Sequence, residues 1–243
     1  MKLSLMRRLR VSRIIRSLKH SLSVLNQVTR PALDSLSQCI DEVGIDLVID
    51  VGANVGQFAS DLRIAGYDGE IYSFEPASLP FSNLVKNSSR DTLWSVFNFG
   101  LGSINQEVDL NIASNDGLSS SILKPNLHSG FFPSVQFNST EKIQVLTLSK
   151  FIQDMKLEHR RILLKIDAQG AESMILEGAR EVFDSVISTY VELSLVELYQ
   201  GETGALGILN KLSDAGHEIS DIKRGAESRF GRLLQIDVVT RRR

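Results

Sequence analysis

The sequence predicts a single α/β domain built on a largely parallel, doubly wound sheet. The first observation is the composition, because 243 residues with 42% hydrophobic and 23% charged residues are typical of one soluble globular domain. The second is the alternation of strand-length apolar runs with helical patterns from residue 45 onward. The third is a pair of glycines directly after the first apolar run. Together they predict parallel strands with helices on both faces of the sheet.

Apolar runs and helical patterns can be assigned in chain order. Runs with the length of buried strands occur at residues 47–51, 70–74, 93–99, 162–166 and 187–195. Helical patterns occupy residues 55–65, 80–87, 172–183 and 205–215. Residues 107–113 and 142–148 alternate between apolar and polar side chains, which is typical of exposed-face or edge strands. We expect the long polar stretch between these two runs to be functional, because idle loops of that length are uncommon in compact domains.

The first 30 residues differ from the rest in charge. They contain eight Lys or Arg and no Asp or Glu, although the whole chain has a net charge of −2. Leu9, Ile14, Leu18 and Leu22 recur near helical spacing. The sequence therefore predicts a basic N-terminal helical extension at residues 1–44, followed by one domain at residues 45–243. The extension can be interpreted as a solvated tail or flanking helix, as a helix on an anionic membrane surface, or as a contact for nucleic acid.

Cysteine usage and hydropathy bear on the compartment. Cys39 is the single cysteine, so no internal disulfide can form, and the sequence has no CxxC or HxxH pair that would predict a metal site. No apolar stretch approaches the roughly 20 residues of a membrane span, and no signal-peptide pattern follows the basic residues. We expect a cytoplasmic protein, with peripheral contact at the inner membrane face as the alternative that the basic extension leaves open.

The stretch LVIDVGANVGQF, residues 47–58, predicts a ligand site. It places Asp50 in the first strand and Gly52 and Gly56 in a turn at the carboxyl edge of the sheet, where doubly wound folds bind nucleotide-like ligands. Asn54 replaces the middle glycine of GxGxxG, which a dinucleotide site requires. A carboxylate at Asp50 repels phosphate but attracts an ammonium or sulfonium ion. S-adenosylmethionine carries both cations and no phosphate, so the motif favours this cofactor and disfavours a dehydrogenase.

A second acid supports the same site. Glu75 follows the second apolar run, residues 70–74. An acid at the corresponding place in dinucleotide-binding proteins accepts hydrogen bonds from ribose hydroxyls. We therefore expect Glu75 to bind the ribose of the cofactor.

Five stretches between residues 48 and 239 resemble the FkbM family of S-adenosylmethionine-dependent methyltransferases: VIDVGANVGQF, SFEP, LLKIDAQGAESMILEGA, VELSLVELYQGE and GRLLQIDVV. The resemblance implies a class I methyltransferase, Rossmann-like fold, with a mostly parallel seven-stranded sheet, an antiparallel last strand and helices on both faces. It also implies transfer of a methyl group to a hydroxyl of a sugar, polysaccharide precursor or secondary metabolite. The family commonly has D-V-E-G where this chain has Asp167-Ala168-Gln169-Gly170, so Gln169 is not assigned the role of an acid.

The motifs and the resemblance together give a set of candidate cofactor-binding residues. Ser119 and Ser120 match a serine-containing patch of the family. The full set comprises Asp50, Gly52, Ala53, Asn54, Gly56, Gln57, Phe58, Glu75, Pro76, Gly100, Leu101, Ser119 and Ser120.

Three residues are candidates for the chemistry at the acceptor. Asp167, at the carboxyl end of a buried strand, is interpreted as a general base or an orienter of the acceptor hydroxyl. The alternative is an N-cap or turn carboxylate for the helix that begins near Glu172. Lys165 lies on the same strand face and either keeps Asp167 ionised or is a snorkelling lysine. Glu192 is the third candidate, near the end of the strand at 187–195.

The long polar stretch is expected to shape acceptor specificity. Phe131 and Phe132 offer rings on which a sugar can stack. His128 is interpreted as an exposed histidine, with a base on a lid as the alternative. We expect a small-molecule or glycan hydroxyl acceptor. No nucleic acid partner is expected, because the body of the sequence has neither an NPPY-like motif nor a basic stripe. A non-catalytic cofactor-binding module and a nucleic-acid methyltransferase are the alternatives, and the oligomeric state does not follow from the sequence.

Overall fold

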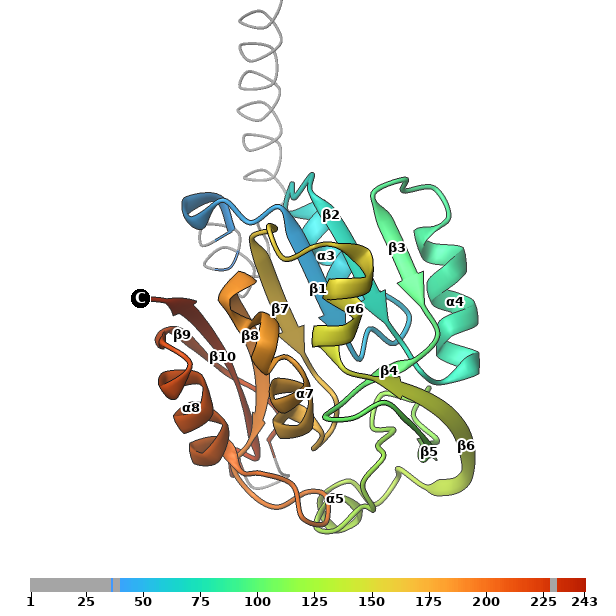
Figure 1. Cartoon of the computed structure of the whole chain (residues 1–243). Coiled ribbons are helices and arrows are strands. Elements are labelled where there is room, and N and C mark those ends of the chain that lie inside the picture. Colours follow the sequence, from blue (N-terminus) through green and yellow to red (C-terminus); the bar gives the residue numbers. More distant parts are fainter. Residues whose placement is uncertain (1–35, 37–39, 228–230) are drawn as a thin grey trace, which may run out of the picture.

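The computed structural model describes residue 36, residues 40–227 and residues 231–243 (Figure 1). Most of the predicted basic extension and Cys39 lie outside these residues. Leu36 and Ile40 are buried in a cluster with residues of the sheet, so the core includes two side chains that precede residue 45. Among the described residues, no helix is both long enough and apolar enough to cross a membrane.

The main sheet has seven strands. They are β1 (Leu47–Val51), β2 (Glu70–Phe74), β3 (Trp94–Phe97), β7 (Ile162–Ile166), β8 (Val186–Ser194), β9 (His217–Arg224) and β10 (Gln235–Arg242). Their spatial order is β3-β2-β1-β7-β8-β10-β9. The pairs among β3, β2, β1, β7 and β8 are parallel, whereas β10 is antiparallel to both β8 and β9. The predicted seven-stranded, mostly parallel sheet with an antiparallel last strand is confirmed.

Helices cover both faces of this sheet (Figure 1). They are α3 (Gln57–Ile64), α4 (Ser78–Ser88), α6 (Leu148–Met155), α7 (Glu172–Gly178), α8 (Ala205–Asp214) and the 3₁₀ helix η1 (Arg180–Ser185). Successive side chains of a strand point to opposite faces of the sheet. Because helices cover both faces, every residue of β1 is buried. Leu47, Ile49 and Val51 join the core under α6, α7 and α8, whereas Val48 joins the core under α3 and α4.

A second, smaller sheet lies beside the carboxyl edge of the first (Figure 1). It contains β4 (Gly100–Leu101), β5 (Gln106–Ala113) and β6 (Phe137–Leu146), in the order β4-β6-β5. The runs predicted as edge strands thus form a sheet of their own. The long connection between β5 and β6 contains the single-turn helix α5 (His128–Phe131).

Two predicted elements differ from the structure. The strand expected at 142–148 begins at Phe137 and ends at Leu146, because Thr147 caps helix α6 by accepting a hydrogen bond from Lys150 N at 3.2 Å. The helix expected at 172–183 divides after Gly178 into α7 and η1. A Cβ at Gly178 would lie 1.9 Å from the carbonyl oxygen of Gly102, so α7 ends where it packs directly against the chain after β4.

Candidate functional site

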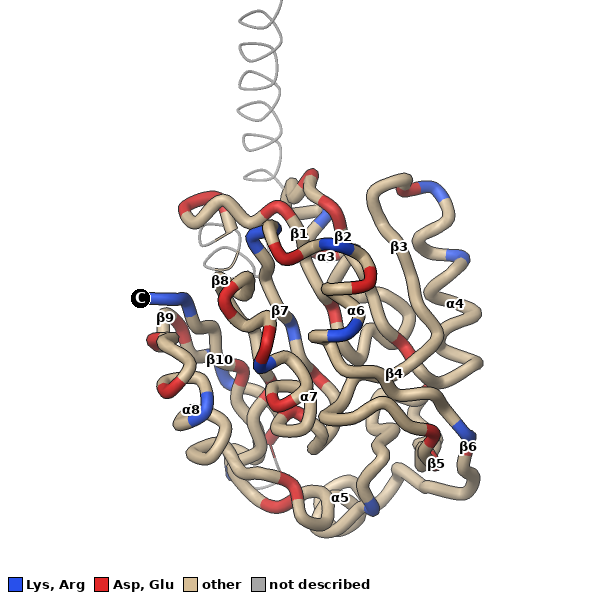
Figure 2. The backbone as a smooth tube through the Cα atoms, viewed as in Figure 1, with Lys and Arg blue, Asp and Glu red and all other residues tan. Residues whose placement is uncertain are grey.

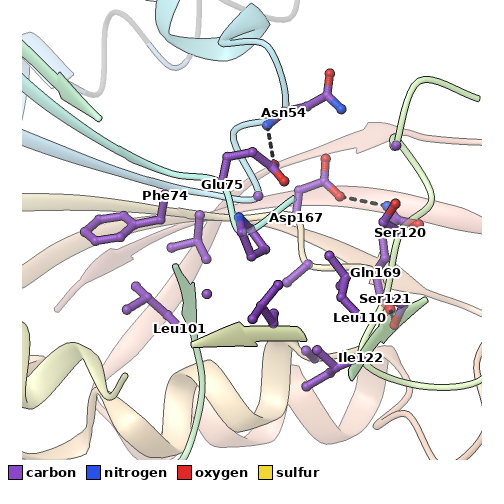
Figure 3. A pocket seen from close by; sticks show the side chains of 18 of the residues that line it. Asn54, Phe74, Glu75, Leu101, Leu110, Ser120, Ser121, Ile122, Asp167 and Gln169 are labelled. Atoms are coloured by element: carbon purple, nitrogen blue, oxygen red, sulfur yellow. Dashed lines mark hydrogen bonds between the residues drawn. The ribbon is translucent and has the colours of Figure 1, made fainter. Parts of the chain in front are cut away.

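A pocket opens at the carboxyl edge of the main sheet, where β1 and β7 lie side by side and the strand order reverses (Figure 3). Its walls come from the ends of β1, β2 and β7, from the small sheet, and from the connection between β5 and β6. The lining residues are Val51, Gly52, Asn54, Phe74, Glu75, Pro76, Gly100, Leu101, Leu110, Gly117, Leu118, Ser120, Ser121, Ile122, Ile143, Val145, Asp167, Ala168, Gln169 and Ala171. Segments far apart in the sequence therefore build one site.

The carboxylate of Glu75 faces this pocket from the end of β2 (Figure 3). Its Oε2 accepts a hydrogen bond from Asn54 N at 2.8 Å, and its Oε1 accepts one from Ala77 N at 2.8 Å. Each oxygen keeps the capacity to accept a second hydrogen bond. Burial raises the pKa of Glu75 to about 7, against the opposing effect of the two backbone donors.

The polar groups of the pocket fit S-adenosylmethionine. Two carboxylates line it, those of Glu75 and Asp167, and no Lys or Arg is among the described residues that do so. Such a site favours a ligand with hydroxyls and cationic groups and disfavours phosphate. Each oxygen of the Glu75 carboxylate can still accept one hydrogen bond, which suits the two hydroxyls of a ribose. Gly100 and Leu101 form an adjoining wall of backbone and apolar surface.

The raised pKa of Glu75 predicts pH-dependent cofactor binding. A diol that donates two hydrogen bonds favours the ionised carboxylate, so protonation of Glu75 opposes binding below its pKa. With a pKa of about 7, we expect the Kd for S-adenosylmethionine to rise roughly tenfold between pH 8 and pH 6. Isothermal calorimetry at several pH values measures this change. The variant Glu75→Gln isolates the contribution of this carboxyl group. Its affinity for S-adenosylmethionine should be lower than that of the wild type, and any remaining pH dependence of its Kd comes from the ligand.

Neighbouring protein atoms leave no room for a side chain at the two glycines of the turn. Gly52 has φ +72°, and a Cβ there would lie 1.8 Å from the carbonyl oxygen of Asp167. Gly56 has φ +90°, and its Cβ would lie 2.6 Å from the Trp94 ring. Both glycines thus allow the turn to pack against β7 on one side and against Trp94 on the other.

Asp50 and Lys165 form a buried network beneath this turn. Asp50 is fully buried, and its Oδ1 lies 3.1 Å from Lys165 Nζ in an ion pair without hydrogen-bond geometry. Lys165 Nζ also donates to Val51 O at 3.2 Å and to Gly52 O at 2.9 Å. Burial alone would lower the pKa of Lys165, but the carboxylates of Asp50 and Asp167 outweigh it and raise the pKa. The ammonium therefore stays charged and ties β7 to the glycine turn.

The network continues on the other side of Asp50. Its Oδ2 accepts a hydrogen bond from Ser73 Oγ at 3.1 Å, and Ser73 Oγ accepts one from Trp94 Nε1 at 3.0 Å. The chain of contacts thus runs from β3 through β2 and β1 to β7, directly under the pocket floor.

Asp167 follows β7 and lies 37% exposed at the pocket wall. Its Oδ1 accepts a hydrogen bond from Gln169 Nε2 at 2.8 Å, and its Oδ2 lies 3.9 Å from Lys165 Nζ. It does not cap α7, whose N-cap is Ala171 without a side-chain hydrogen bond. The capping interpretation of Asp167 is therefore wrong.

Glu172 closes the turn after β7 instead. Its Oε1 accepts hydrogen bonds from the backbone N–H groups of Ala168 and Gly170, both at 3.1 Å. Burial raises the pKa of Glu172 to about 7. This carboxylate orders the segment that carries Asp167 and Gln169.

The expectation of an exposed His128 is also wrong. The ring is 3% exposed, it packs against Phe132, Phe137 and Tyr199, and its Nε2 lies 3.0 Å from Ser119 Oγ. Burial lowers the pKa of His128. The histidine thus anchors the long connection instead of facing solvent.

Some of the candidate residues line the pocket, and others do not. Gly52, Asn54, Glu75, Pro76, Gly100, Leu101, Ser120 and Asp167 line it, whereas Asp50, Ala53, Gly56, Gln57, Phe58, Ser119, Lys165 and Glu192 do not. An apolar wall that the sequence does not predict is formed by Leu110, Ile122, Ile143 and Val145. The alternation of apolar residues in β5 and β6 signals a buried face, but it does not say which site that face covers.

Comparisons with known proteins agree with this architecture. A model of the FkbM methyltransferase domain matches residues 50–219. The 2-O-methyltransferase NoeI of Sinorhizobium fredii is 27% identical over 187 residues, which cover 74% of this chain and 76% of that protein. The structure of an FkbM methyltransferase from Methylobacillus flagellatus superposes with a TM-score of 0.51 and 16% identity over 80% of this chain, and the chain spans 43% of that longer protein. At that identity the likeness shows the fold alone.

Proposed function

This chain belongs to the FkbM methyltransferase family, which uses S-adenosylmethionine, and from that premise we propose that it methylates a hydroxyl oxygen of a sugar, a polysaccharide precursor or a related secondary metabolite. The observation that carries the proposal is the placement of Asp167. Its carboxylate lies on the wall of the same pocket that Glu75 and the glycine turn line. A 27% identical relative bears the name of a 2-O-methyltransferase, which supports oxygen as the acceptor atom.

Residues of the pocket are assigned to the cofactor by their chemistry. Glu75 accepts the ribose hydroxyls, and the backbone of Gly52 and Asn54 borders the amino-acid end. Pro76, Gly100 and Leu101 form the apolar side that suits an aromatic base. Asp50 supports this arrangement from below through Lys165, without lining the pocket itself.

S-adenosylmethionine, when bound, supplies a methyl group on a positively charged sulfur, which departs as a neutral thioether. The protein contributes position and a proton acceptor. An acceptor oxygen held in line with the methyl carbon needs little further activation, but its proton must leave. Asp167 accepts that proton at its Oδ2, the oxygen that takes no hydrogen bond from the described residues.

The distribution of charge supports a neutral acceptor over a polyanion. Figure 2 shows Lys and Arg interspersed with Asp and Glu over the described part of the chain. The pocket itself presents two carboxylates. A phosphate-rich acceptor would be repelled there, so a glycan or small-molecule hydroxyl is the acceptor that we propose.

The test is methyl transfer to a panel of sugar and secondary-metabolite hydroxyls, detected by mass spectrometry. We expect one acceptor class to gain a methyl group, and we expect Asp167→Asn to lower kcat about 100-fold. Cofactor affinity should fall by a smaller factor, because the pocket loses one of its two carboxylates. Asp154→Asn is the matched control, because that carboxylate lies on the surface of α6 and, among the described residues, forms an ion pair with Lys150 alone, at 2.8 Å. Methylation of oligonucleotides alone would overturn the proposal, and so would full activity in Asp167→Asn.

A further inference from the structure

The turn after β7 places a glutamine amide between two carboxylates. Gln169 Nε2 donates to Asp167 Oδ1 at 2.8 Å and to Glu192 Oε2 at 3.0 Å. Its Oε1 lies 2.9 Å from the hydroxyl of Tyr199, which can donate to it. The NH₂ end of the amide thus faces the two acids, and each acid accepts one of its hydrogens. Both hydrogens of the amide are therefore engaged, and its oxygen faces the Tyr199 hydroxyl, whose single proton is shared with the carbonyl oxygen of Ser119 at 2.9 Å.

The backbone at this position is strained. Gln169 has φ +52°, in the left-handed region where residues other than glycine, asparagine and aspartate are uncommon. Its carbonyl oxygen accepts a hydrogen bond from Ser121 Oγ at 2.7 Å, which holds the turn against the long connection. Strain of this kind persists only where the surrounding structure holds the residue in place. The hydrogen bonds of the Gln169 amide and of its carbonyl oxygen hold it here.

Asp167 is consequently engaged at one oxygen and open at the other. Oδ1 is bound by Gln169, whereas Oδ2 has only the ion pair with Lys165 Nζ at 3.9 Å among the described residues. The side chain of Asp167 is still 37% exposed. The geometry leaves one oxygen of a fixed carboxylate available to the pocket.

The charged surroundings favour a neutral donor at position 169. The titratable groups that act on this centre are Lys165 of β7, Asp50 of β1, Glu172 of α7, Tyr190 and Glu192 of β8, Asp237 of β10 and Tyr199 of the following loop. Burial, followed by the charges of Asp167 and Asp237, raises the pKa of Glu192 well above its usual value. Another carboxylate at position 169 would add repulsion, whereas an amide relieves it.

We propose that Gln169 is a positioning residue for methyl transfer, which fixes Asp167 with Oδ2 toward the acceptor hydroxyl and uses Glu192 and Tyr199 as its own anchors. The inference rests on the proposed function. In the step it serves, the proton of the acceptor hydroxyl passes to Asp167 Oδ2 and the acceptor oxygen forms a bond to the methyl carbon. The electron pair of the broken C–S bond stays on sulfur. Gln169 touches none of the reacting atoms and acts through Asp167.

The experiment compares Gln169→Asn with Gln169→Glu. Asparagine tolerates a positive φ and keeps the turn, but its shorter side chain cannot reach both acids. Glutamate has the reach but replaces the donor by an acceptor. We expect kcat to fall about tenfold in each variant, with a smaller change in the KM for the acceptor. The acidic limb of the kcat profile should move up by about one pH unit in Gln169→Asn, and further in Gln169→Glu.

A ¹³C NMR spectrum of the aspartate carboxylates at a fixed pH reports on the same centre without turnover. The Asp167 signal, assigned by its loss in Asp167→Asn, should change its chemical shift in both Gln169 variants, because Oδ1 loses the hydrogen bond from Gln169 Nε2. Tyr199→Phe should shift it in the same direction by less, because the amide loses its anchor but keeps both acids. Because Tyr199→Phe leaves residue 169 unchanged, it tests the same contact if the turn fails to fold in the Gln169 variants.

The outcomes separate the two proposals. If the wild type methylates no hydroxyl acceptor while the Asp167 signal still responds to Gln169, the proposed function fails and the contact stands. If the wild type is active but the variants keep its kcat profile and the chemical shift of its Asp167 signal, Gln169 has no positioning role and this inference is overturned.

Discussion

Gly52→Ala is expected to destabilise the protein by about 4 kcal/mol or more and to abolish cofactor binding. The added Cβ would lie 1.8 Å from the carbonyl oxygen of Asp167, and neither atom belongs to a flexible side chain. The turn would have to move away from β7, carrying Asn54 and its hydrogen bond to Glu75 with it. Urea denaturation measures the free energy of unfolding, and calorimetry measures the loss of S-adenosylmethionine binding.

Gly201→Ala is the matched control for this change. Gly201 has φ +75°, close to the +72° of Gly52, but no atom lies within 4 Å of the position of its Cβ. It therefore reports the backbone strain alone, about 1–2 kcal/mol, and should leave cofactor affinity unchanged. Equal losses of stability in the two variants would mean that the close approach of β1 and β7 does not constrain the turn.

Lys165→Met is expected to cost about 3–5 kcal/mol of stability. The substitution leaves Asp50 fully buried without its cationic partner, and within the described part of the chain only Ser73 then donates a hydrogen bond to its carboxylate. It also removes the two hydrogen bonds that hold the carbonyl groups of Val51 and Gly52. Thermal and urea unfolding measure the loss, and calorimetry should show weaker cofactor binding, because the turn loses its support.

A double-mutant cycle with Asp50→Asn tests the pairing itself. The double variant should be more stable than the sum of the single losses implies, by about 1–3 kcal/mol, since neither residue is left as a lone buried charge. Strict additivity would contradict a direct ion pair. Lys142→Met is the control for losing a lysine charge, because its ion pairs with Glu107 and Asp109 join exposed side chains.

The main sheet was predictable because its sequence signals are local. Strands buried on both faces are written as continuous apolar runs, and β1 and β7 match the predicted 47–51 and 162–166 in full. The resemblance to the FkbM family is confirmed by the match over residues 50–219, which reaches four of the five stretches and leaves residues 231–239 outside. Helix α6 was not predicted, although Thr147 is an N-cap residue of a common type, because an apolar strand runs directly into it.

The site was predictable only in part. Motif spacing identified Glu75 and Asp167, which the fold does bring to one pocket. The sequence could not reveal that Asp50 turns beneath the pocket, since the partner that holds it there, Lys165, is distant along the chain. The small sheet was missed as a wall for the same reason: Leu110, Ile143 and Val145 meet Ala77 only in the folded chain. Contacts between distant segments have no local signature.

The chain has a single tryptophan, and it stands at the far end of the Asp50 network. The indole of Trp94 donates to Ser73 and is the ring that a Cβ at Gly56 would strike. Its ultraviolet emission therefore comes from one place, the contact between β3 and the glycine turn. The integrity of the turn can therefore be followed optically in the unmodified protein, with no label attached.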